Sequence, residues 1–198
     1  MIMKKKIAIT GGIGSGKSTV LREISKMGYP VFSCDEIYKK VIITPTYMEE
    51  IRRHFPNCIK DGKVDRQALS TAIFQNENSR KKLNELSHPL IMSNLLTQMD
   101  ASPSRVVFAE VPLLFEGNFE SLFDGVIVVS RKIEERIQSL IVRDNITKEE
   151  INARISAQFD YHSETAAQRL KNCNAYIIEN EGDISNLQTK ISQFIQSL

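Results

Sequence analysis

Short apolar runs alternate with longer amphipathic stretches along this chain of 198 residues. The β-branched runs at 105–109 and 125–130 are typical of strands that are buried on both faces of a parallel sheet. Similar short runs at 6–10, 30–32 and 175–178 predict three further strands. Because helical stretches separate these runs, the pattern predicts an α/β fold with a doubly wound parallel sheet of about five strands.

Two of the helical stretches carry clear end signals. In the first, apolar residues recur on one helical face after residue 17, and Gly28 is a suitable C′ residue. In the second, Thr147 and Glu150 predict a capping box. An apolar stripe then continues from Ile151 to Phe159, which predicts one amphipathic helix over that span.

The interval from about 36 to 100 breaks the alternation. It contains no convincing strand, only a helical pattern interrupted by Pro56, by residues 60–63 and by His88-Pro89. This is more chain than one crossover connection requires, so we expect a helical insertion. The insertion is either a substrate-binding lobe or a stack of covering helices, and the pattern alone favours neither.

Residues 11–18 form a phosphate-binding motif. They read Gly-Gly-Ile-Gly-Ser-Gly-Lys-Ser, which is the P-loop pattern G-x4-G-K-S, between an apolar strand and an amphipathic helix. Glycines let backbone N–H groups converge on phosphate oxygens, and the following helix adds its N-terminal dipole. Lys17 is expected to reach the β- and γ-phosphates, and the Ser18 hydroxyl to bind Mg²⁺. The predicted nucleotide-binding residues are Gly12, Ile13, Gly14, Ser15, Gly16, Lys17, Ser18 and Thr19.

A P-loop by itself does not separate kinases from GTPase switches or mechanical ATPases. The Asn-Lys-x-Asp and Asp-x-x-Gly elements of guanine-specific proteins do not occur in this sequence. A phosphotransferase also needs a base near its acceptor hydroxyl and cations that close over the phosphoryl group. The remaining candidate residues are therefore those that could act as this base or as these cations.

Two carboxylates and one histidine are candidates for such roles. Asp35 follows the second strand, at the sheet edge where α/β folds bind ligands, and is the candidate base; the alternative is that it helps to cap the next helix. Glu110 ends the third predicted strand and either holds the Mg²⁺ water shell or is an ordinary strand-end carboxylate. His88 either hydrogen-bonds a phosphate or hydroxyl group, or is a structural residue before a proline.

Arg136 and Arg143 lie seven residues apart after the fourth predicted strand, roughly on one helix face. A guanidinium matches phosphate oxygens in pairs, so these arginines are candidates for a lid over ATP. The alternative is a solvated face with charge pairs, for example to Glu135 or Asp144.

Composition narrows the class of protein. With 26 basic and 24 acidic residues, no strong field of one sign predicts a nucleic-acid or membrane partner. We expect no signal peptide and no transmembrane helix, because no apolar run approaches about 18 residues. Cys34, Cys58 and Cys173 fit no metal or disulfide pattern, which indicates a reducing compartment and predicts a cytoplasmic protein.

Several strings together resemble the dephospho-CoA kinase family, from residue 6 to about residue 182. Residues 9–19 match the opening of that family nearly letter for letter. Further similarities, in order and spacing, are HPLI at 88–91, VPLLFE at 111–116, Arg143-Asp144, Gln158 and IEN at 178–180. The HPLI and VPLLFE strings are much more specific than the P-loop, which many families share.

The resemblance implies one P-loop kinase domain over 1–198, with a CoA-binding lobe at about 36–100 and a helical lid at about 131–160. It implies phosphorylation of the ribose 3′-hydroxyl of dephospho-CoA by ATP and Mg²⁺, the last step of coenzyme A synthesis. A monomer or weak homo-oligomer is expected. The alternatives are another nucleoside or nucleotide kinase, or a P-loop regulator that transfers no phosphate.

The resemblance also implies residue roles. Asp35 matches an aspartate near the acceptor hydroxyl, His88 a substrate-side histidine, and Arg143 a lid arginine that contacts phosphates. Pro112 and Leu113 fall in the substrate-binding string, and Asn180 falls on the ATP side.

Two departures from the family pattern stand out. Ser33 replaces the first acid of an Asp-Ala-Asp string, and Ser139 replaces an arginine four residues before Arg143. Arg136, one helical turn from Ser139, is a possible substitute for that arginine.

Overall fold

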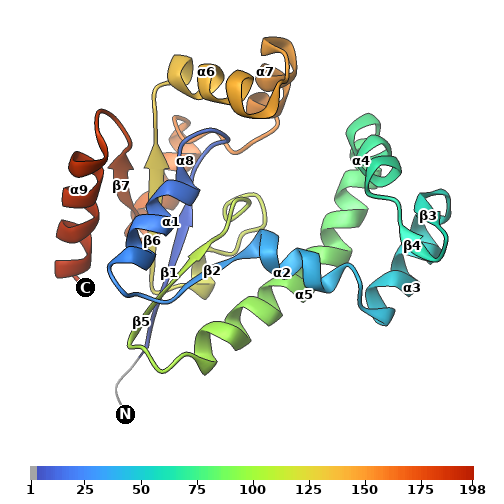
Figure 1. The fold of residues 1–198 in the computed structure, drawn as a ribbon, viewed down its shortest axis with the longest axis horizontal. Helices are drawn as coiled ribbons and strands as arrows, with labels where there is room; N and C mark the ends of the chain where they lie inside the picture. Colours follow the sequence, from blue (N-terminus) through green and yellow to red (C-terminus); the bar gives the residue numbers. More distant parts are fainter. Residues whose placement is uncertain (1–3) are drawn as a thin grey trace. The chain divides into compact units, whose positions relative to one another are not determined.

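The computed structural model describes residues 4–198, apart from the side chains of residues 74 and 75. The chain forms two compact units (Figure 1). The first, which we call the sheet unit, consists of the chain up to Phe32 together with Ser102–Leu198. The second, the inserted unit, is Ser33–Ala101.

A five-stranded parallel sheet forms the centre of the sheet unit, with the order β2-β5-β1-β6-β7. Its strands are β1 (Lys5–Thr10), β2 (Val31–Ser33), β5 (Val106–Glu110), β6 (Gly125–Ser130) and β7 (Tyr176–Glu179). In the register, Ile7 of β1 lies opposite Phe108 on one side and Gly125 on the other. The predicted α/β class and all five predicted strands are confirmed, with ends that differ by no more than one residue.

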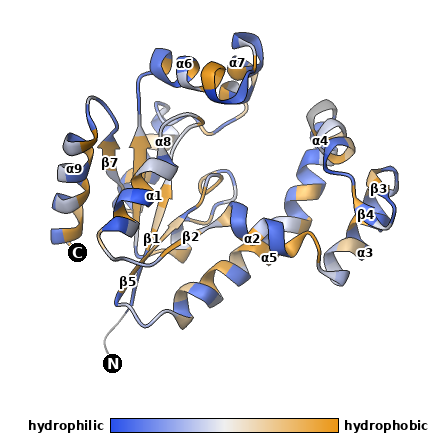
Figure 2. Ribbon diagram, in the orientation of Figure 1, coloured by the Kyte–Doolittle hydropathy of each residue, from blue (hydrophilic) through white to orange (hydrophobic). Residues whose placement is uncertain are grey.

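The core of the sheet unit lies on both faces of the central strands. Ile7, Phe108 and Ile127 are fully buried on one face of the sheet, and Ala8 and Val126 are fully buried on the other. The hydropathy colours show apolar residues concentrated in these strands (Figure 2). Helices cover the strands through a shared cluster that includes Val20, Ile24, Leu187, Ile191 and Phe194. Burial on both faces explains why the strands appear in the sequence as continuous apolar runs rather than as alternating patterns.

The helices of the sheet unit are α1 (Lys17–Lys26), α6 (Ile133–Asp144), α7 (Lys148–Ser156), α8 (Glu164–Asn172) and α9 (Ile184–Gln196), with a short 3₁₀ turn η2 (Glu120–Leu122). Two predicted end signals are confirmed. Gly28 follows α1 with a left-handed φ of 87°. Thr147 and Glu150 make both hydrogen bonds of a capping box at the start of α7.

The predicted stripe from Ile151 to Phe159 is wrong at its far end. Helix α7 ends at Ser156, and Phe159 lies beyond it. The Phe159 ring stacks on Phe115, with ring centroids 4.7 Å apart. An aromatic contact to a distant segment thus decides where this side chain is buried, and helical periodicity does not record such a contact.

The inserted unit contains α2 (Cys34–Val41), α3 (Pro45–His54), α4 (Arg66–Gln75) and α5 (Glu77–Ala101), with a 3₁₀ turn η1 (Pro56–Cys58) and two short strands, β3 (Ile59–Lys60) and β4 (Lys63–Val64). The prediction that residues 36–100 lack strands is therefore wrong. Antiparallel β3 and β4 are joined by Asp61 and Gly62, which both have positive φ, 50° and 72°. An Asp-Gly pair is a strong hairpin signal, but strands of two residues show no periodicity.

The predicted interruption at His88-Pro89 is also absent, since Pro89 lies inside α5. Proline there removes one backbone hydrogen bond of the helix. Burial of Leu83, Leu95 and Met99 along α5 offsets that cost. The Tyr47 hydroxyl also hydrogen-bonds the buried Ser87 Oγ at 2.8 Å, which joins α3 to α5.

No helix within residues 4–198 has the length and apolar content that crossing a bilayer would require.

Candidate active site at the phosphate loop

The phosphate loop connects β1 to α1 in the sheet unit. Gly16 is the N-cap residue of α1 and has a left-handed backbone with φ of 96°. A side chain at this position would be strained, and an added Cβ would lie 2.1 Å from Nδ2 of Asn180. As a result the N-terminus of α1 is open toward the loop, which is where a helix dipole favours an anion.

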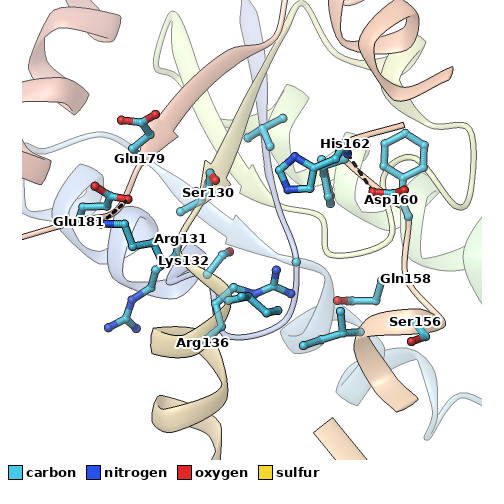
Figure 3. A pocket seen from close by; sticks show the side chains of 18 residues that line it. Ser130, Arg131, Lys132, Arg136, Ser156, Gln158, Asp160, His162, Glu179 and Glu181 are labelled. Atoms are coloured by element: carbon cyan, nitrogen blue, oxygen red, sulfur yellow. Dashed lines mark hydrogen bonds and ion pairs between the residues drawn. The ribbon is translucent and has the colours of Figure 1, made fainter. Parts of the chain in front are cut away.

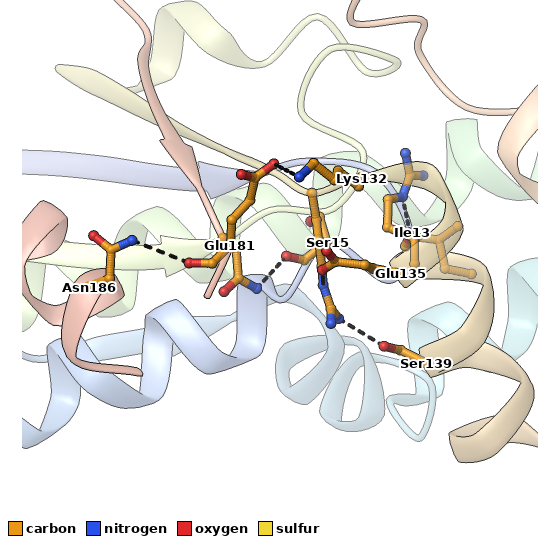
Figure 4. A network of polar contacts seen from close by, with 10 residues as sticks. Ile13, Ser15, Lys132, Glu135, Ser139, Glu181 and Asn186 are labelled. Atoms are coloured by element: carbon orange, nitrogen blue, oxygen red, sulfur yellow. Dashed lines mark hydrogen bonds and ion pairs between the residues drawn. The ribbon is translucent and has the colours of Figure 1, made fainter. Parts of the chain in front are cut away.

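Asn180 braces this loop from the far end of β7. Its Nδ2 donates to the backbone carbonyl of Ser15 at 2.8 Å, across 165 residues of sequence. Figure 4 shows Ser15 together with Glu181, which follows Asn180 and pairs with Lys132 at 3.6 Å. The structure thus places Asn180 against the predicted nucleotide-binding loop.

Lys17 and Ser15 have the chemistry that a phosphate group requires. The Lys17 ammonium donates to the carbonyls of Gly11 at 2.8 Å and Gly12 at 3.1 Å, so the cation lies over the loop. The Ser15 hydroxyl is buried and has no hydrogen-bond partner among the described residues. A buried hydroxyl without a partner costs free energy, which a bound phosphate oxygen would recover.

Ser18 and Glu110 form a cluster of hard oxygen atoms at the edge of the sheet. Glu110 ends β5 beside Ile9 of β1, so its carboxylate lies at the carboxyl edge where α1 begins. The Ser18 hydroxyl lies 3.2 Å from Glu110 Oε1 and 3.3 Å from Oε2. Mg²⁺ prefers such oxygen ligands and retains several waters, so the pair fits a magnesium ion whose remaining ligands are phosphates and water.

A cavity of about 720 Å³ opens beside the phosphate loop (Figure 3). It is lined by Gly12 and Ser15 of the loop, by residues 128–133 and Arg136, by residues 155, 156 and 158–162, and by Glu179 and Glu181. Its volume lies within the range of small-molecule sites.

The segment after α7, which lines this cavity, is hydrogen-bonded to the phosphate loop and to neighbouring residues. The Gln158 side-chain oxygen accepts from the Ile13 N–H at 2.7 Å, and the Phe159 N–H donates to Glu116 at 2.9 Å. The Tyr161 hydroxyl lies 3.2 Å from Thr10 Oγ1. Burial raises the pKa of Tyr161 to about 12, so its hydroxyl remains protonated at neutral pH. The sequence did not predict a role for Tyr161, because its contact with Thr10 spans 151 residues and no local sequence motif indicates it.

The two lid candidates on α6 have different surroundings. Arg143 is two-thirds exposed and forms a paired contact with Asp144, Nε to Oδ1 at 2.7 Å and Nη2 to Oδ2 at 2.8 Å. This contact raises the pKa of Arg143 and lowers that of Asp144. Arg136 is partly buried, and its Nε donates to the Ile13 carbonyl at 2.8 Å. Of the two arginines, Arg136 is the one that contacts the phosphate loop.

Asp35 and His88 belong to the inserted unit. Asp35 lies in the first turn of α2, exposed and two residues after β2 ends. Ser33 holds the N-cap position without a side-chain cap bond, and Asp35 is one of two acidic residues in the first turn. His88 is partly buried in α5, and burial lowers its pKa, which keeps the imidazole neutral at pH 7.

Pro112 and Leu113 lie in the turn after β5, in the sheet unit. Leu113 is 37% exposed, whereas the next residues, Leu114 and Phe115, are buried and anchor the turn. The turn therefore presents an apolar side chain close in sequence to Glu110.

Comparison with known proteins identifies the family. The sequence model of the dephospho-CoA kinase family (CoaE) matches residues 5–186. A dephospho-CoA kinase of Listeria innocua is 34% identical, over 98% of this chain and 97% of the relative. Among solved structures, TT1252 of Thermus thermophilus has a TM-score of 0.83 at 31% identity, covering 99% of this chain and 98% of that one. Dephospho-CoA kinase from Campylobacter jejuni has a TM-score of 0.67 at 27% identity, covering 98% and 97%. The chain belongs to the dephospho-CoA kinase family.

Proposed function

We propose that this chain transfers the γ-phosphoryl group of ATP to the ribose 3′-hydroxyl of dephospho-CoA, giving coenzyme A and ADP. The observation that carries this proposal is the family match over residues 5–186, which includes the complete phosphate loop. Family members catalyse the last step of coenzyme A synthesis. A cytoplasmic setting is part of the proposal, in keeping with three free cysteines.

The phosphate loop and its braces are the proposed ATP site. The Lys17 ammonium binds the phosphates together with backbone N–H groups of residues 12–19, apart from the Ile13 N–H, which donates to Gln158. Asn180 holds the Ser15 peptide in place. The adjoining cavity of about 720 Å³ accommodates the rest of the nucleotide. Arg143 is proposed to leave Asp144 and bind phosphate when the lid over 131–160 closes.

Magnesium is proposed to sit at Ser18 and Glu110, the first as a direct ligand and the second through water. When bound, the ion neutralises charge on the β- and γ-phosphates.

The inserted unit is proposed to bind the CoA moiety. Asp35 orients the 3′-hydroxyl and accepts its proton as the oxygen attacks the γ-phosphorus. His88, neutral because it is partly buried, is a proposed hydrogen-bond partner of the acceptor. Pro112 and Leu113 are proposed to contact the substrate through their apolar surfaces. Because the transition state is loose, alignment of the hydroxyl matters more than the strength of the base.

We expect Ser18→Ala to raise the half-saturating Mg²⁺ concentration about 10- to 100-fold, because the hydroxyl beside Glu110 is lost. Ser18→Thr keeps the hydroxyl and should restore the wild-type titration. Ser25→Ala removes an exposed hydroxyl from the same helix and is the matched control. Initial rates against Mg²⁺ at fixed ATP test this, and identical titrations for Ser18→Ala and wild type would remove Ser18 from the metal site.

The acceptor is tested by measuring ADP release with dephospho-CoA, AMP, adenosine or shikimate present. The proposal predicts release that depends on dephospho-CoA and is far slower with the other three. Faster release with AMP or adenosine would make the chain a different nucleotide kinase. ADP release that no acceptor stimulates would contradict phosphotransfer altogether.

A further inference from the structure

We propose that Arg136 is a further catalytic residue, which contacts the transferring γ-phosphoryl group through the two terminal nitrogens of its guanidinium. This inference rests on the proposed phosphotransfer function. It concerns helix α6, which carries Ser139 at the position where the resemblance to the family leads us to expect an arginine.

The first support is the position of the guanidinium on the phosphate loop. Arg136 extends from α6, and its Nε donates to the Ile13 carbonyl at 2.8 Å. Its Nη2 lies so close to Gly12 that a Cβ on that glycine would be 2.4 Å away. Gly12 therefore leaves room for the guanidinium. Both residues line the cavity that includes Ser15, and Figure 3 shows Arg136 among the side chains that line it.

The second support is that Arg136 has donors left for a ligand. Nε makes its one hydrogen bond recorded within residues 4–198, so Nη1 and Nη2 are not committed to protein acceptors there. Burial lowers the pKa of Arg136, yet an arginine side chain stays charged in proteins. Two parallel N–H groups on a fixed guanidinium match two oxygens of one phosphoryl group.

The loop residue that anchors Arg136 is itself held from both sides. The Ile13 carbonyl accepts from Arg136, while the Ile13 N–H donates to Gln158 at 2.7 Å. One residue of the loop, through its two adjacent peptide groups, is thus tied to α6 and to the segment after α7. The guanidinium therefore loses little freedom when phosphate binds, which favours contact in the transition state.

The third support is that the Ser139 side chain already has a structural role, as a hydrogen-bond acceptor for Arg131. Arg131 donates from Nε to Glu135 at 2.9 Å and from Nη1 to the Ser139 hydroxyl at 2.8 Å. The Ser139 position therefore supplies an acceptor for Arg131 rather than a cation for phosphate. Arg136 is left as the α6 cation that lies on the loop.

In the proposed step, the 3′-oxygen forms a bond to the γ-phosphorus while the bond from that phosphorus to the bridging oxygen of ADP breaks. The hydroxyl proton passes to Asp35. Negative charge shifts toward the bridging oxygen and is spread over the equatorial oxygens. A cation at the Gly12 side of the loop stabilises this charge more in the transition state than in bound ATP, so its effect appears in kcat.

The substitution Arg136→Gln separates catalysis from loop anchoring. The Gln Nε2 stands at the same distance along the side chain as Arg Nε, so it still donates to the Ile13 carbonyl, but the charge and both terminal nitrogens are gone. We expect kcat to fall about 10²- to 10³-fold, with KM for ATP and the melting temperature nearly unchanged. Arg136→Lys keeps a charge without the planar pair of donors and should also lose most of kcat. Arg105→Gln removes an exposed arginine that lies outside residues 131–160, and it is the control that keeps wild-type kcat.

Binding of Mg·ADP with aluminium fluoride, a planar mimic of the transferring phosphoryl group, gives a readout independent of the acceptor. Fluoride should tighten ADP binding in wild type and in Arg105→Gln, but not in Arg136→Gln. The inference is overturned by a kcat for Arg136→Gln within about threefold of wild type, by full fluoride tightening, or by activity lost only together with melting temperature. If wild type fails to phosphorylate dephospho-CoA, the acceptor is wrong, and the fluoride comparison still decides the role of Arg136.

Discussion

Replacing Lys17 by alanine should lower kcat about 10³-fold and weaken ATP binding about tenfold. The Lys17 ammonium lies over the phosphate loop, against the carbonyls of Gly11 and Gly12. With ATP bound, it is the cation proposed to lie on the β- and γ-phosphates, so its loss weakens the ground state and the transition state together. Initial rates and titration calorimetry with a non-hydrolysable ATP analogue measure the two effects separately.

Lys171→Ala, on the exposed side of α8, is the matched control, and both of its parameters should stay at the wild-type values. A Lys17→Ala protein that retains both the wild-type kcat and the wild-type ATP affinity would show that the loop does not hold the reacting phosphate. Loss of affinity alone, with kcat intact, would mean that Lys17 binds ATP equally in the ground and transition states.

Replacing Asp35 by asparagine should lower kcat about 10²- to 10⁴-fold while leaving ATP affinity nearly unchanged. Asparagine keeps the size of the side chain but removes its negative charge and replaces one acceptor oxygen by an NH2 donor, so the residue can no longer accept the hydroxyl proton. Asp35 is exposed in the first turn of α2, where its side chain is accessible to a ligand. Single-turnover rates with saturating dephospho-CoA measure the chemical step directly.

Glu36 is the natural control for this change, because it is the next carboxylate on the same turn. It pairs with Lys39 at 2.5 Å, and this contact lowers its pKa. Glu36→Gln should leave the single-turnover rate at the wild-type value. Wild-type chemistry in Asp35→Asn would remove the assignment of Asp35 as the base.

The sequence predicts the sheet well because its strands are buried on both faces. Ile7, Phe108 and Ile127 are fully buried, and burial of that kind requires continuous apolar runs. The hairpin at Asp61-Gly62 was missed although its turn residues are diagnostic, since its strands are too short to show a pattern. The predicted helix break at Pro89 is wrong because packing along a 25-residue helix outweighs the tendency of one proline to interrupt it.

In the candidate site, the phosphate loop can be predicted from the sequence, whereas the contacts between distant residues cannot. The P-loop is one continuous string, so its cradle can be predicted from spacing alone. The contacts of Ile13 with Arg136 and Gln158 join residues 123 and 145 positions apart, and they depend on how α6 and the segment after α7 pack. Arg136 and Arg143 share a helix and a residue type, yet one contacts the loop and the other pairs with Asp144.

The central claim is that the chain transfers the γ-phosphoryl group of ATP to one particular hydroxyl. The most direct test is ¹H–³¹P correlation NMR of the product formed from Mg·ATP and dephospho-CoA. The account predicts a new phosphomonoester resonance that correlates with the ribose H3′ proton, with one ADP released for each phosphate transferred. A correlation with H2′ instead, or ADP released without any new phosphomonoester, would contradict it.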